Sequence, residues 1–463
     1  MKNKFYDVIV VGGGAAGIAA ALAALCAFRA EKKPVRLAVL ERNKEGGKKL
    51  AVTGNGRCNV TNTWALAAQY GSKEPLLAKD ILAKITPAET LKFFEGLGLF
   101  CREEEEGRVY PFHGQAAVLR DLLVRRTEEL GAEWHYGFAV KSVEQGAADG
   151  KSGGASGGPQ NPEAAFRLVS ETGDVLWAHK VILAPGGKAG IRTGSQGDGY
   201  RWLRTLGHTV VRPHPALVQL TQEDPYLGSL KGVRALGKVT LLRDGKEAGF
   251  SRGEIQFGQG VLSGICIFDL SRLVADTEDH TYEAVLDLVP DLSREELLNR
   301  LRKLTAAEED LLSESVAAAD LCTAVETLLS AFLPAKLAEA LSKVASGRHK
   351  DPLTEAAGLL KEYKLTITGT KGWVEAQVTA GGIDLAEVKE DTLESRLVPG
   401  LYLAGELLDA DGPCGGFNLQ WAWTTGFLAG CAAADTEWGC LPAAGNLRGC
   451  EPCADEKKEE GLA

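Results

Sequence analysis

The sequence predicts an α/β protein in which a Rossmann-like, parallel-sheet domain is interrupted by an inserted β unit that carries a helical subdomain. Near the start, an apolar run over residues 6–11 passes through three glycines into an Ala/Leu-rich stretch that continues to about residue 30. Short strands with turn signals occupy about 208–270, and helical periodicity occupies about 292–347. Glycine-dense strand segments resume after residue 376, so we expect the end of the chain to complete the first domain.

The glycine turn near the start has the spacing of a dinucleotide-binding motif. Gly12, Gly14 and Gly17 follow the pattern G-x-G-x-x-G, in which the glycines permit the turn, the approach of a pyrophosphate and the packing of helix on strand. The phosphates would lie at the unpaired N–H groups of the helix start. A second apolar strand at 35–40 ends in Glu41, whose carboxylate can accept hydrogen bonds from a ribose diol. Together these features predict a dinucleotide site.

The same stretch has a competing interpretation as a targeting segment. Residues 8–28 carry no charge and follow two lysines, as in a signal peptide or a membrane span. However, three consecutive glycines interrupt the run, alanine outnumbers leucine in it, and a second strand follows directly. We therefore expect no membrane segment. Ten cysteines without a signal peptide indicate a reducing compartment, so the expected location is the cytoplasm.

Bulk charge argues against polyanionic partners. The chain of 463 residues has a formal net charge of −10 at pH 7, which gives no electrostatic help to binding nucleic acid or an anionic membrane. We expect a small-molecule substrate and no obligate protein partner. The pair Cys450 and Cys453 has no histidine nearby to complete a zinc site, so no metal is expected. The charged ending predicts a loose tail over residues 436–463.

Three further segments extend the expected ligand site. Residues 53–62 form a loop dense in glycine, amide and hydroxyl groups, with one cation, Arg57. A strand at 180–183 ends in small residues, as parallel strands do where they meet a ligand crevice. The glycine-rich run 400–420 leads into a final helix expected from Trp421 to about residue 434.

These patterns divide the chain into a discontinuous nucleotide-binding domain and an insertion. We expect helices at 77–98 and 115–130, and a flexible hairpin loop at 146–163. The expected boundaries place the nucleotide-binding domain at 1–205 and 366–435, the inserted β domain at 206–275 and 348–365, and the helical subdomain at 276–347.

Four stretches together resemble a known family: residues 8–17, 53–62, 378–383 and 401–420. The chain resembles the BaiN/RdsA-like NAD(P)/FAD-dependent oxidoreductases, also labelled aminoacetone-oxidase-like flavoproteins, up to about residue 434. This resemblance implies a Rossmann-like FAD-binding domain of the two-dinucleotide-binding flavoprotein type, with an inserted β-barrel-like domain and a helical subdomain. Family members commonly have Thr followed by His or Asp before a Gly-Leu/Ile-Ser-Gly stretch. Here Gly258 and Gln259 stand at that place. If the position handles substrate, the family's substrate does not carry over to this chain; if it only turns a strand, the departure has no consequence.

The resemblance implies FAD at the first glycine turn and assigns contacts along its length. Gly12, Gly14, Ala16 and Gly17 would meet the pyrophosphate, Glu41 and Arg42 the adenosine ribose, and Val140 the adenine; Asn55, Gly56, Arg57 and Cys58 would follow the pyrophosphate and ribityl chain, as would Gly405, Glu406 and Asp409; Asn418, Leu419 and Gln420 would present backbone N–H groups to the isoalloxazine. The start of the final helix would stabilise negative charge on reduced flavin.

Only one glycine fingerprint is present, so NAD(P)H is expected as a transient electron donor without a domain of its own. The family resemblance favours reduction of a conjugated C=C bond in an enone of the 3-oxo-steroid (bile-acid) type. Such a reaction needs a proton donor near the flavin. The candidates are Cys58, Tyr110, His113 and Cys414, although each also has a purely structural interpretation.

Three alternative functions remain open from the sequence. One is an oxidase that passes electrons from an amine or aminoketone to O₂. Another is an FAD-dependent RNA-modifying protein, which the net charge and the lack of a basic stripe disfavour. The last is a flavin-binding scaffold without turnover. The sequence distinguishes neither NADH from NADPH nor one oligomeric state from another.

Overall fold

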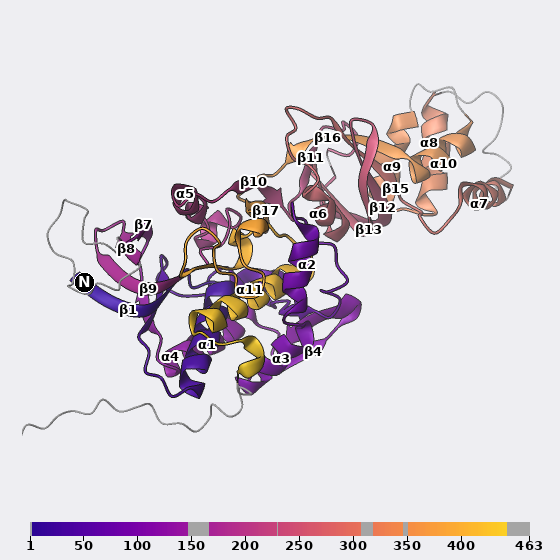
Figure 1. Cartoon of the computed structure of the whole chain (residues 1–463). Helices are drawn as coiled ribbons and strands as arrows, with labels where there is room; N and C mark the ends of the chain where they lie inside the picture. Colours follow the sequence, from indigo (N-terminus) through magenta and orange to yellow (C-terminus); the bar gives the residue numbers. More distant parts are fainter. Residues whose placement is uncertain (1, 147–165, 229, 307–317, 346–350, 442–463) are drawn as a thin grey trace, which may run out of the picture. The chain divides into compact units, whose positions relative to one another are not determined.

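A computed structural model describes residues 2–146, 166–228, 230–306, 318–345 and 351–441 (Figure 1). The chain forms two compact units, one of Met1–Pro213 with Thr379–Ala463 and the other of His214–Val378. The boundaries predicted from the sequence are 205/206 and 365/366. Cys450, Cys453, most of the expected hairpin loop and most of the expected tail lie outside the described residues.

The first unit is built on a seven-stranded sheet with the strand order β6-β2-β1-β9-β8-β7, in which β18 also pairs with β9. The strands are β1 (Lys2–Val11), β2 (Leu37–Glu41), β6 (Glu133–Tyr136), β7 (Val140–Gln145), β8 (Phe166–Ser170), β9 (Val175–Leu183) and β18 (Leu401–Leu403). Strands β6, β2, β1, β9 and β18 pair in parallel, whereas β7 and β8 form an antiparallel extension. The carboxyl ends of β1, β2, β9 and β18 therefore meet at one edge of the sheet.

Helices α1 (Ala15–Ala30) and α11 (Phe417–Ala433) lie side by side in the core of this unit (Figure 1). Both are mainly apolar and almost completely buried, as expected for a helix enclosed by a large domain. A Cβ atom at Gly426 would lie 2.4 Å from the carbonyl oxygen of Ala16, and one at Gly430 would lie 2.2 Å from that of Ala20. The two glycines of α11 therefore permit a close backbone approach that larger residues would prevent.

Shorter elements surround this core. They are η1 (Leu50–Gly56), β3 (Thr61–Asn62), α2 (Pro75–Ala83), α3 (Pro87–Gly96), β4 (Cys101–Glu103), η2 (Glu105–Gly107), β5 (Arg108–Pro111), α4 (Ala116–Glu129), η3 (Ile191–Thr193), α5 (Asp198–Thr205), η6 (Leu385–Glu387), η7 (Gly405–Leu407) and η8 (Trp438–Cys440). The helix expected at 77–98 is two helices, because Pro87 cannot continue α2 and instead begins α3. Helix α11 begins at Phe417, four residues before the expected start at Trp421. Trp438 stacks on Phe427 with ring centroids 4.7 Å apart, so packed structure extends past the expected boundary at residue 435.

The second unit is a closed barrel with the strand order β11-β14-β13-β12-β15-β16, accompanied by helices. Its strands are β11 (Leu220–Gln222), β12 (Val233–Arg243), β13 (Lys246–Gly258), β14 (Val261–Ser263), β15 (Tyr282–Asp287) and β16 (Tyr363–Thr370), and its helices are α6 (Ile265–Ser271), α7 (Arg294–Ala306), α8 (Ala318–Ser330), α9 (Ala335–Ser342), η5 (Lys343–Ala345) and α10 (Pro352–Lys361). A two-stranded sheet of β10 (Val210–Ala216) and β17 (Val378–Ile383) completes the described elements. The expected β-barrel-like insertion with helices is confirmed. Inward-facing Val239, Leu241, Ile255 and Phe257 are buried, alternate with half-buried residues and fill the barrel.

The residues that depart from the family pattern lie in a β-hairpin. Gly258 pairs with Val261, which leaves Gln259 and Gly260 as a two-residue turn between β13 and β14. Gly260 has φ +65, a left-handed backbone conformation that glycine adopts without strain. The position at which this chain departs from the family pattern therefore lies at a turn between two strands.

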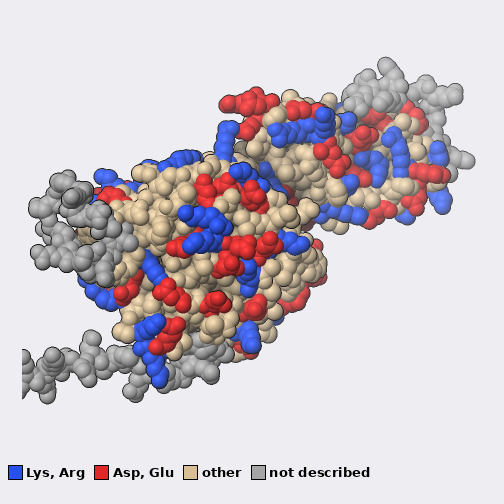
Figure 2. Space-filling view, viewed as in Figure 1, with Lys and Arg blue, Asp and Glu red and all other residues tan. Residues whose placement is uncertain are grey.

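The surface carries both signs of charge. On the face shown in Figure 2, Lys and Arg side chains are interspersed with Asp and Glu, and no large area has a single sign. Among the described residues, no helix has the length and hydropathy needed to cross a bilayer.

Candidate dinucleotide site

In the glycine turn between β1 and α1, two glycines lie too close to backbone atoms to carry a side chain, and a third borders open space. Gly12 has φ +99, and a Cβ there would lie 2.3 Å from the carbonyl oxygen of Ala184. A Cβ at Gly17 would lie 1.8 Å from the carbonyl oxygen of Gly12, so both positions exclude a side chain. A Cβ at Gly14 would meet no atom within 4 Å. Gly14 therefore borders open space, as a pyrophosphate cradle requires.

The electrostatics of this turn also suit an anion. Gly14 caps α1 without a side-chain hydrogen bond, and the first turn of the helix contains no acidic residue. No acidic residue of α1 itself offsets the positive end of the helix dipole, and the nearby Glu41 carboxylate accepts from Gly13 N, not from the N–H groups of the helix. The residues present fit the pyrophosphate of a dinucleotide such as FAD.

Glu41 stands at the end of β2, where the sequence predicted a ribose-binding acid. Its side chain is buried and accepts hydrogen bonds from Gly13 N at 2.9 Å and from Asn43 N at 2.8 Å. A third bond comes from Nδ2 of Asn43 at 2.7 Å. A carboxylate has about four lone-pair positions, so acceptor capacity for one ribose hydroxyl remains. Arg42, by contrast, points to α5, where its guanidinium pairs with Asp198 at 2.9 Å.

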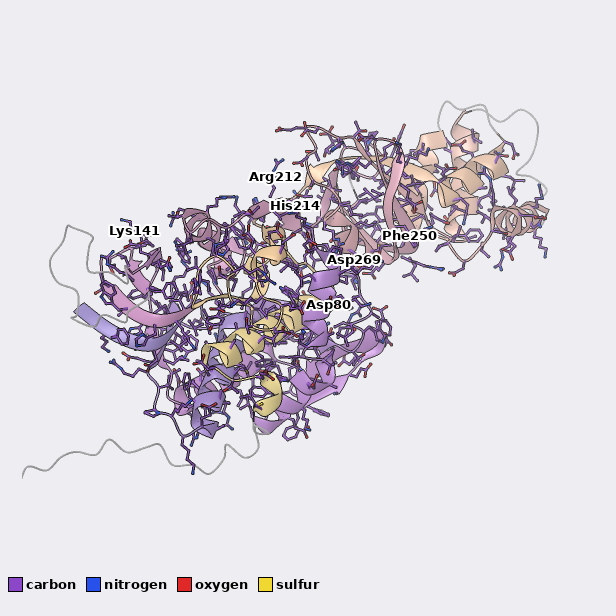
Figure 3. All side chains as sticks on the ribbon, viewed as in Figure 1. Asp80, Lys141, Arg212, His214, Phe250 and Asp269 are labelled. Atoms are coloured by element: carbon purple, nitrogen blue, oxygen red, sulfur yellow. The ribbon has the colours of Figure 1, made fainter. Side chains whose placement is uncertain are left out.

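The segment before β7 crosses the end of β2. Phe138 N donates to the Glu41 carbonyl at 2.9 Å, which brings Val140 into the neighbourhood of the predicted ribose site. Lys141, labelled in Figure 3, follows on β7, and its carbonyl accepts a hydrogen bond from Nε1 of Trp202 on α5 at 3.0 Å. The backbone role that the resemblance gives to Val140 stays a prediction.

Trp134 on β6 is a contributor that the sequence analysis missed. A Cβ at Gly13 would lie 2.5 Å from its indole ring, and one at Gly46 would lie 2.7 Å from it. The indole therefore packs over both glycine turns at this end of the site. A lone tryptophan in a short strand offers no sequence signal for such a contact.

The loop around residues 54–58 has an exposed backbone, and its cation, Arg57, is in contact with two other side chains. Gly54, Asn55 and Gly56 are exposed, and Asn55 has φ +54. The Arg57 guanidinium lies 4.1 Å from the ring centroid of Tyr110 and pairs with Glu104 at 2.7 Å. The cation is thus already held by an aromatic face and a carboxylate.

Two acidic residues of the third predicted segment tie distant parts of the chain together. Glu406 on η7 pairs with Lys49 at 2.5 Å and accepts a hydrogen bond from Oγ1 of Thr379 at 2.7 Å. Asp409 is buried and accepts a hydrogen bond from Lys73 N at 2.7 Å. Lys49 and Thr379 were not among the predicted site residues, because an ion pair between distant segments leaves no local pattern.

Gly405 joins this segment to both buried helices. Its carbonyl accepts from Nε1 of Trp421 on α11 at 3.1 Å, and its N–H donates to Oγ1 of Thr425 at 2.9 Å. A Cβ at Gly405 would lie 2.7 Å from Cβ of Ala16 on α1. The predicted residues Ala16 and Gly405 are therefore in contact.

The start of α11 supplies a second helix N-terminus. Gln420 N donates to the Gly416 carbonyl at 3.0 Å, so the N–H groups without an intrahelical partner belong to the first three helical residues, including Asn418 and Leu419. The Asn418 side chain accepts from Gly412 N at 2.9 Å and donates to its carbonyl at 2.8 Å. The backbone N–H of Gln420, which the resemblance assigns to the isoalloxazine, therefore donates within the helix, to the Gly416 carbonyl.

The four proton-donor candidates have different surroundings. Cys58 is completely buried, and desolvation raises the pKa of its thiol to about 12. Tyr110 is partly buried, and this burial raises the pKa of its phenol despite the opposing Arg108 and Arg57. Cys414 lies close enough to Tyr110 to affect that phenol electrostatically.

His113 lies at a different place. It lines a surface cavity of about 410 Å³ together with Phe100, Phe112 and Arg125. The Nδ1 atom of His113 accepts a hydrogen bond from Gln115 N at 3.1 Å. In the described part of the chain, no three His, Cys, Asp or Glu side chains are arranged to hold a metal ion.

Comparisons with known proteins cover nearly the whole chain. A family model described as the HI0933-like protein Rossmann domain matches residues 6–432. The chain is 35% identical over 436 residues, 92% of this chain and 98% of the relative, to a 3-dehydro-bile acid delta(4,6)-reductase of Clostridium scindens. It is 26% identical to a ribosomal RNA dihydrouridine synthase of Haemophilus influenzae, over 92% of this chain and 98% of that protein. The corresponding Escherichia coli protein is also 26% identical, over 91% and 96% of the two chains.

Proposed function

Because this chain belongs to the HI0933-like Rossmann family of FAD-binding oxidoreductases, we propose that it uses NAD(P)H to reduce a C=C bond conjugated with a carbonyl group. The substrate we propose is a small enone of the 3-oxo-steroid type. The net reaction adds one hydride and one proton across the double bond and releases NAD(P)⁺.

The observation that carries this proposal is the 35% identity to a 3-dehydro-bile acid delta(4,6)-reductase over 92% of this chain. The names of the less similar relatives agree with the same bond chemistry, because dihydrouridine is uridine whose carbonyl-conjugated C=C bond has been reduced. The shared element is therefore reduction of a conjugated C=C bond, and the identity favours the steroid-like substrate.

FAD, when bound, supplies the hydride-accepting and hydride-donating chemistry. We assign the pyrophosphate to the open face of Gly14 and to the N-terminus of α1, since no side chain fills that space. Glu41 keeps acceptor capacity for the ribose. The first turn of α11 contains no acidic residue, so its N–H groups can stabilise negative charge that develops beside them. NAD(P)H would bind transiently, as the single glycine fingerprint in the sequence indicates.

We assign the proton donor to Tyr110. A Cβ at Gly54 would lie 3.8 Å from the Tyr110 ring, so this ring borders the loop that we assign to the cofactor. The phenol carries its proton at neutral pH, so it has a proton to donate, and this assignment rests on its position beside the loop and not on its raised pKa. Cys58 is enclosed by protein, and His113 faces the separate surface cavity.

The proposal is tested by following the flavin absorption band of the purified protein under anaerobic conditions. We expect NADH or NADPH to bleach the band and a conjugated 3-oxo steroid to restore it. Failure of both nicotinamides to bleach the band would remove the reductase function. If an amine or aminoketone bleaches the band and O₂ restores it faster than any enone does, the protein is an oxidase.

A second candidate is reduction of uridine in ribosomal RNA. It is favoured by two relatives at 26% identity that match this chain over more than nine-tenths of its length. The net charge of −10 and the mixed charges in Figure 2 oppose it, since RNA binding depends on basic surface. The same assay separates the two functions, with unmodified ribosomal RNA replacing the steroid and dihydrouridine measured as the product.

A further inference from the structure

A completely buried polar cluster joins α11 to three other segments of the first unit. Nε2 of Gln420 lies 3.1 Å from the Ile85 carbonyl and 3.0 Å from Oγ1 of both Thr90 and Thr424. Oγ1 of Thr61 donates to Oε1 of Gln420 at 2.6 Å. We call Thr61, Thr90, Gln420 and Thr424, with the Ile85 carbonyl, the Gln420 cluster.

The cluster is internal to the protein. The side chains of Thr61, Thr90, Gln420 and Thr424 are all 0% exposed, so none of them lines a space that a cofactor or substrate can enter. Both ends of the Gln420 amide have partners, as the cost of burying a polar group requires. Any role in the reaction must therefore be exerted through the segments that the cluster holds.

Two hydrogen bonds of the cluster, the arms Thr61–Gln420 and Thr90–Gln420, connect α11 to different segments. Thr61 follows the loop at 54–58 in β3, and a Cβ at Gly416 would lie 2.6 Å from the Thr61 carbonyl oxygen. Nearby, Nδ2 of Asn62 donates to the Gly415 carbonyl at 2.9 Å, so β3, the strand that follows the loop, meets the start of α11 here. Thr90 lies on α3 and ties Gln420 to the surrounding protein instead.

We propose that Gln420 is a positioning residue that fixes the loop at 54–58 against the N-terminus of α11 through its bond to Thr61. This inference rests on the proposed FAD function, because both segments are assigned to the cofactor. It gives the Gln420 side chain a role that differs from the isoalloxazine contact predicted for its backbone. A buried hydrogen-bond network holds such a geometry because leaving a member unpaired is costly.

The two arms provide a matched test. Thr61→Val and Thr90→Val are the same isosteric change at two fully buried positions, and each removes one hydrogen bond to Gln420. The dissociation constant for FAD is measured from flavin fluorescence after dilution of the holoprotein, together with the flavin absorption spectrum and the thermal midpoint. We expect Thr61→Val to raise the dissociation constant about tenfold and to shift the absorption bands, in line with the loss of a buried bond. Thr90→Val should change the dissociation constant for FAD by less than about twofold. Both variants should lower the thermal midpoint by similar amounts, since each loses one buried hydrogen bond.

Equal FAD affinities and spectra of the two variants would overturn the inference, whether both match the unaltered protein or both are weakened alike. Thr61→Ser, which keeps the hydroxyl, should restore the affinity, and failure to do so would also contradict the inference. If Thr61→Val does not fold, Thr61→Cys and Thr90→Cys repeat the comparison, because a thiol is a weak hydrogen-bonding group of similar size. Failure of the unaltered protein to bind FAD would remove the proposed function itself, a result distinct from equal variants of a protein that binds FAD.

Discussion

The backbone N–H of Gly13 donates a hydrogen bond to Oε2 of Glu41 at 2.9 Å, which links the glycine turn after β1 to the acid at the end of β2. These are the two features from which the sequence predicted a dinucleotide site. Oε1 of the same carboxylate accepts from Asn43 N at 2.8 Å. One side chain therefore joins the predicted phosphate end and the predicted ribose end of the site.

This relationship predicts that Glu41→Gln weakens folding as well as FAD binding. A glutamine side chain would direct an NH₂ group at one of the two backbone donors, which leaves a buried N–H unpaired. We expect a loss of about 1–3 kcal/mol in the free energy of unfolding, measured by urea denaturation. Glu45→Gln is the control, since Glu45 pairs with Arg120 at the surface and its loss should cost less than about 1 kcal/mol. Equal losses would contradict the assigned role of Glu41.

The glycine turn allows folding and cofactor binding to be separated. At Gly17 a methyl group would lie 1.8 Å from the Gly12 carbonyl oxygen, whereas at Gly14 it would meet no protein atom within 4 Å. We expect Gly17→Ala to cost about 3 kcal/mol or more, or to prevent folding. Gly14→Ala should keep the thermal midpoint of the cofactor-free protein but weaken FAD binding at least about tenfold, measured by fluorescence titration. Normal FAD affinity of Gly14→Ala would exclude the pyrophosphate from this face.

Tyr110→Phe tests the proposed proton donor. We expect the rate of flavin reoxidation by an enone to fall about 10²–10⁴-fold, because the general acid is lost. Bleaching of the flavin by NAD(P)H should be unchanged, since that step needs no proton from Tyr110. Stopped-flow measurement of the two half-reactions separates them. His113→Ala is the control, because His113 lines the separate cavity, and both half-reactions should be unaffected. A Tyr110→Phe variant with a normal reoxidation rate would remove the assignment.

Buried histidines predict acid sensitivity. Burial is the main cause that lowers the pKa of His208 and of His135 below 6.5. The unfolded chain therefore binds protons first, and stability present above pH 6.5 is lost as the pH falls from 6.5 toward the folded-state pKa values. Each histidine contributes a slope of at most about 1.4 kcal/mol per pH unit, measured by urea denaturation from pH 7.5 to 5. In His208→Asn this slope should decrease; an unchanged slope would show that His208 does not titrate on unfolding.

The hydroxyl of Ser395 explains why protonation of His208 destabilises the folded protein. It already accepts hydrogen bonds from Leu397 N at 3.0 Å and from Val398 N at 2.9 Å. Its proton is therefore available for Nε2 of His208, which lies 2.8 Å away. Protonation of Nε2 would break this bond inside the protein.

The first strand, glycine turn and helix could be predicted because their signals are local. A buried strand, the G-x-G-x-x-G spacing and an apolar helix follow one another within about 25 residues, and the structure has them as β1, the turn and α1. The family resemblance based on these and three later segments is confirmed, as is the barrel insertion. The positions of the cofactor contacts stay predictions.

The sequence by itself determined the family and the fold class, and it predicted which segments form the site. Only the tertiary structure decided which side chains pair there. Lys49 and Glu406 lie 357 positions apart in the sequence, and Thr61 and Gln420 lie 359 apart. Backbone preferences depend on neighbours along the chain, whereas the partner of a buried carboxylate or amide depends on which segments packing brings together. The Gln420 side chain could therefore not be recognised as a tie between loop and helix until both were in place.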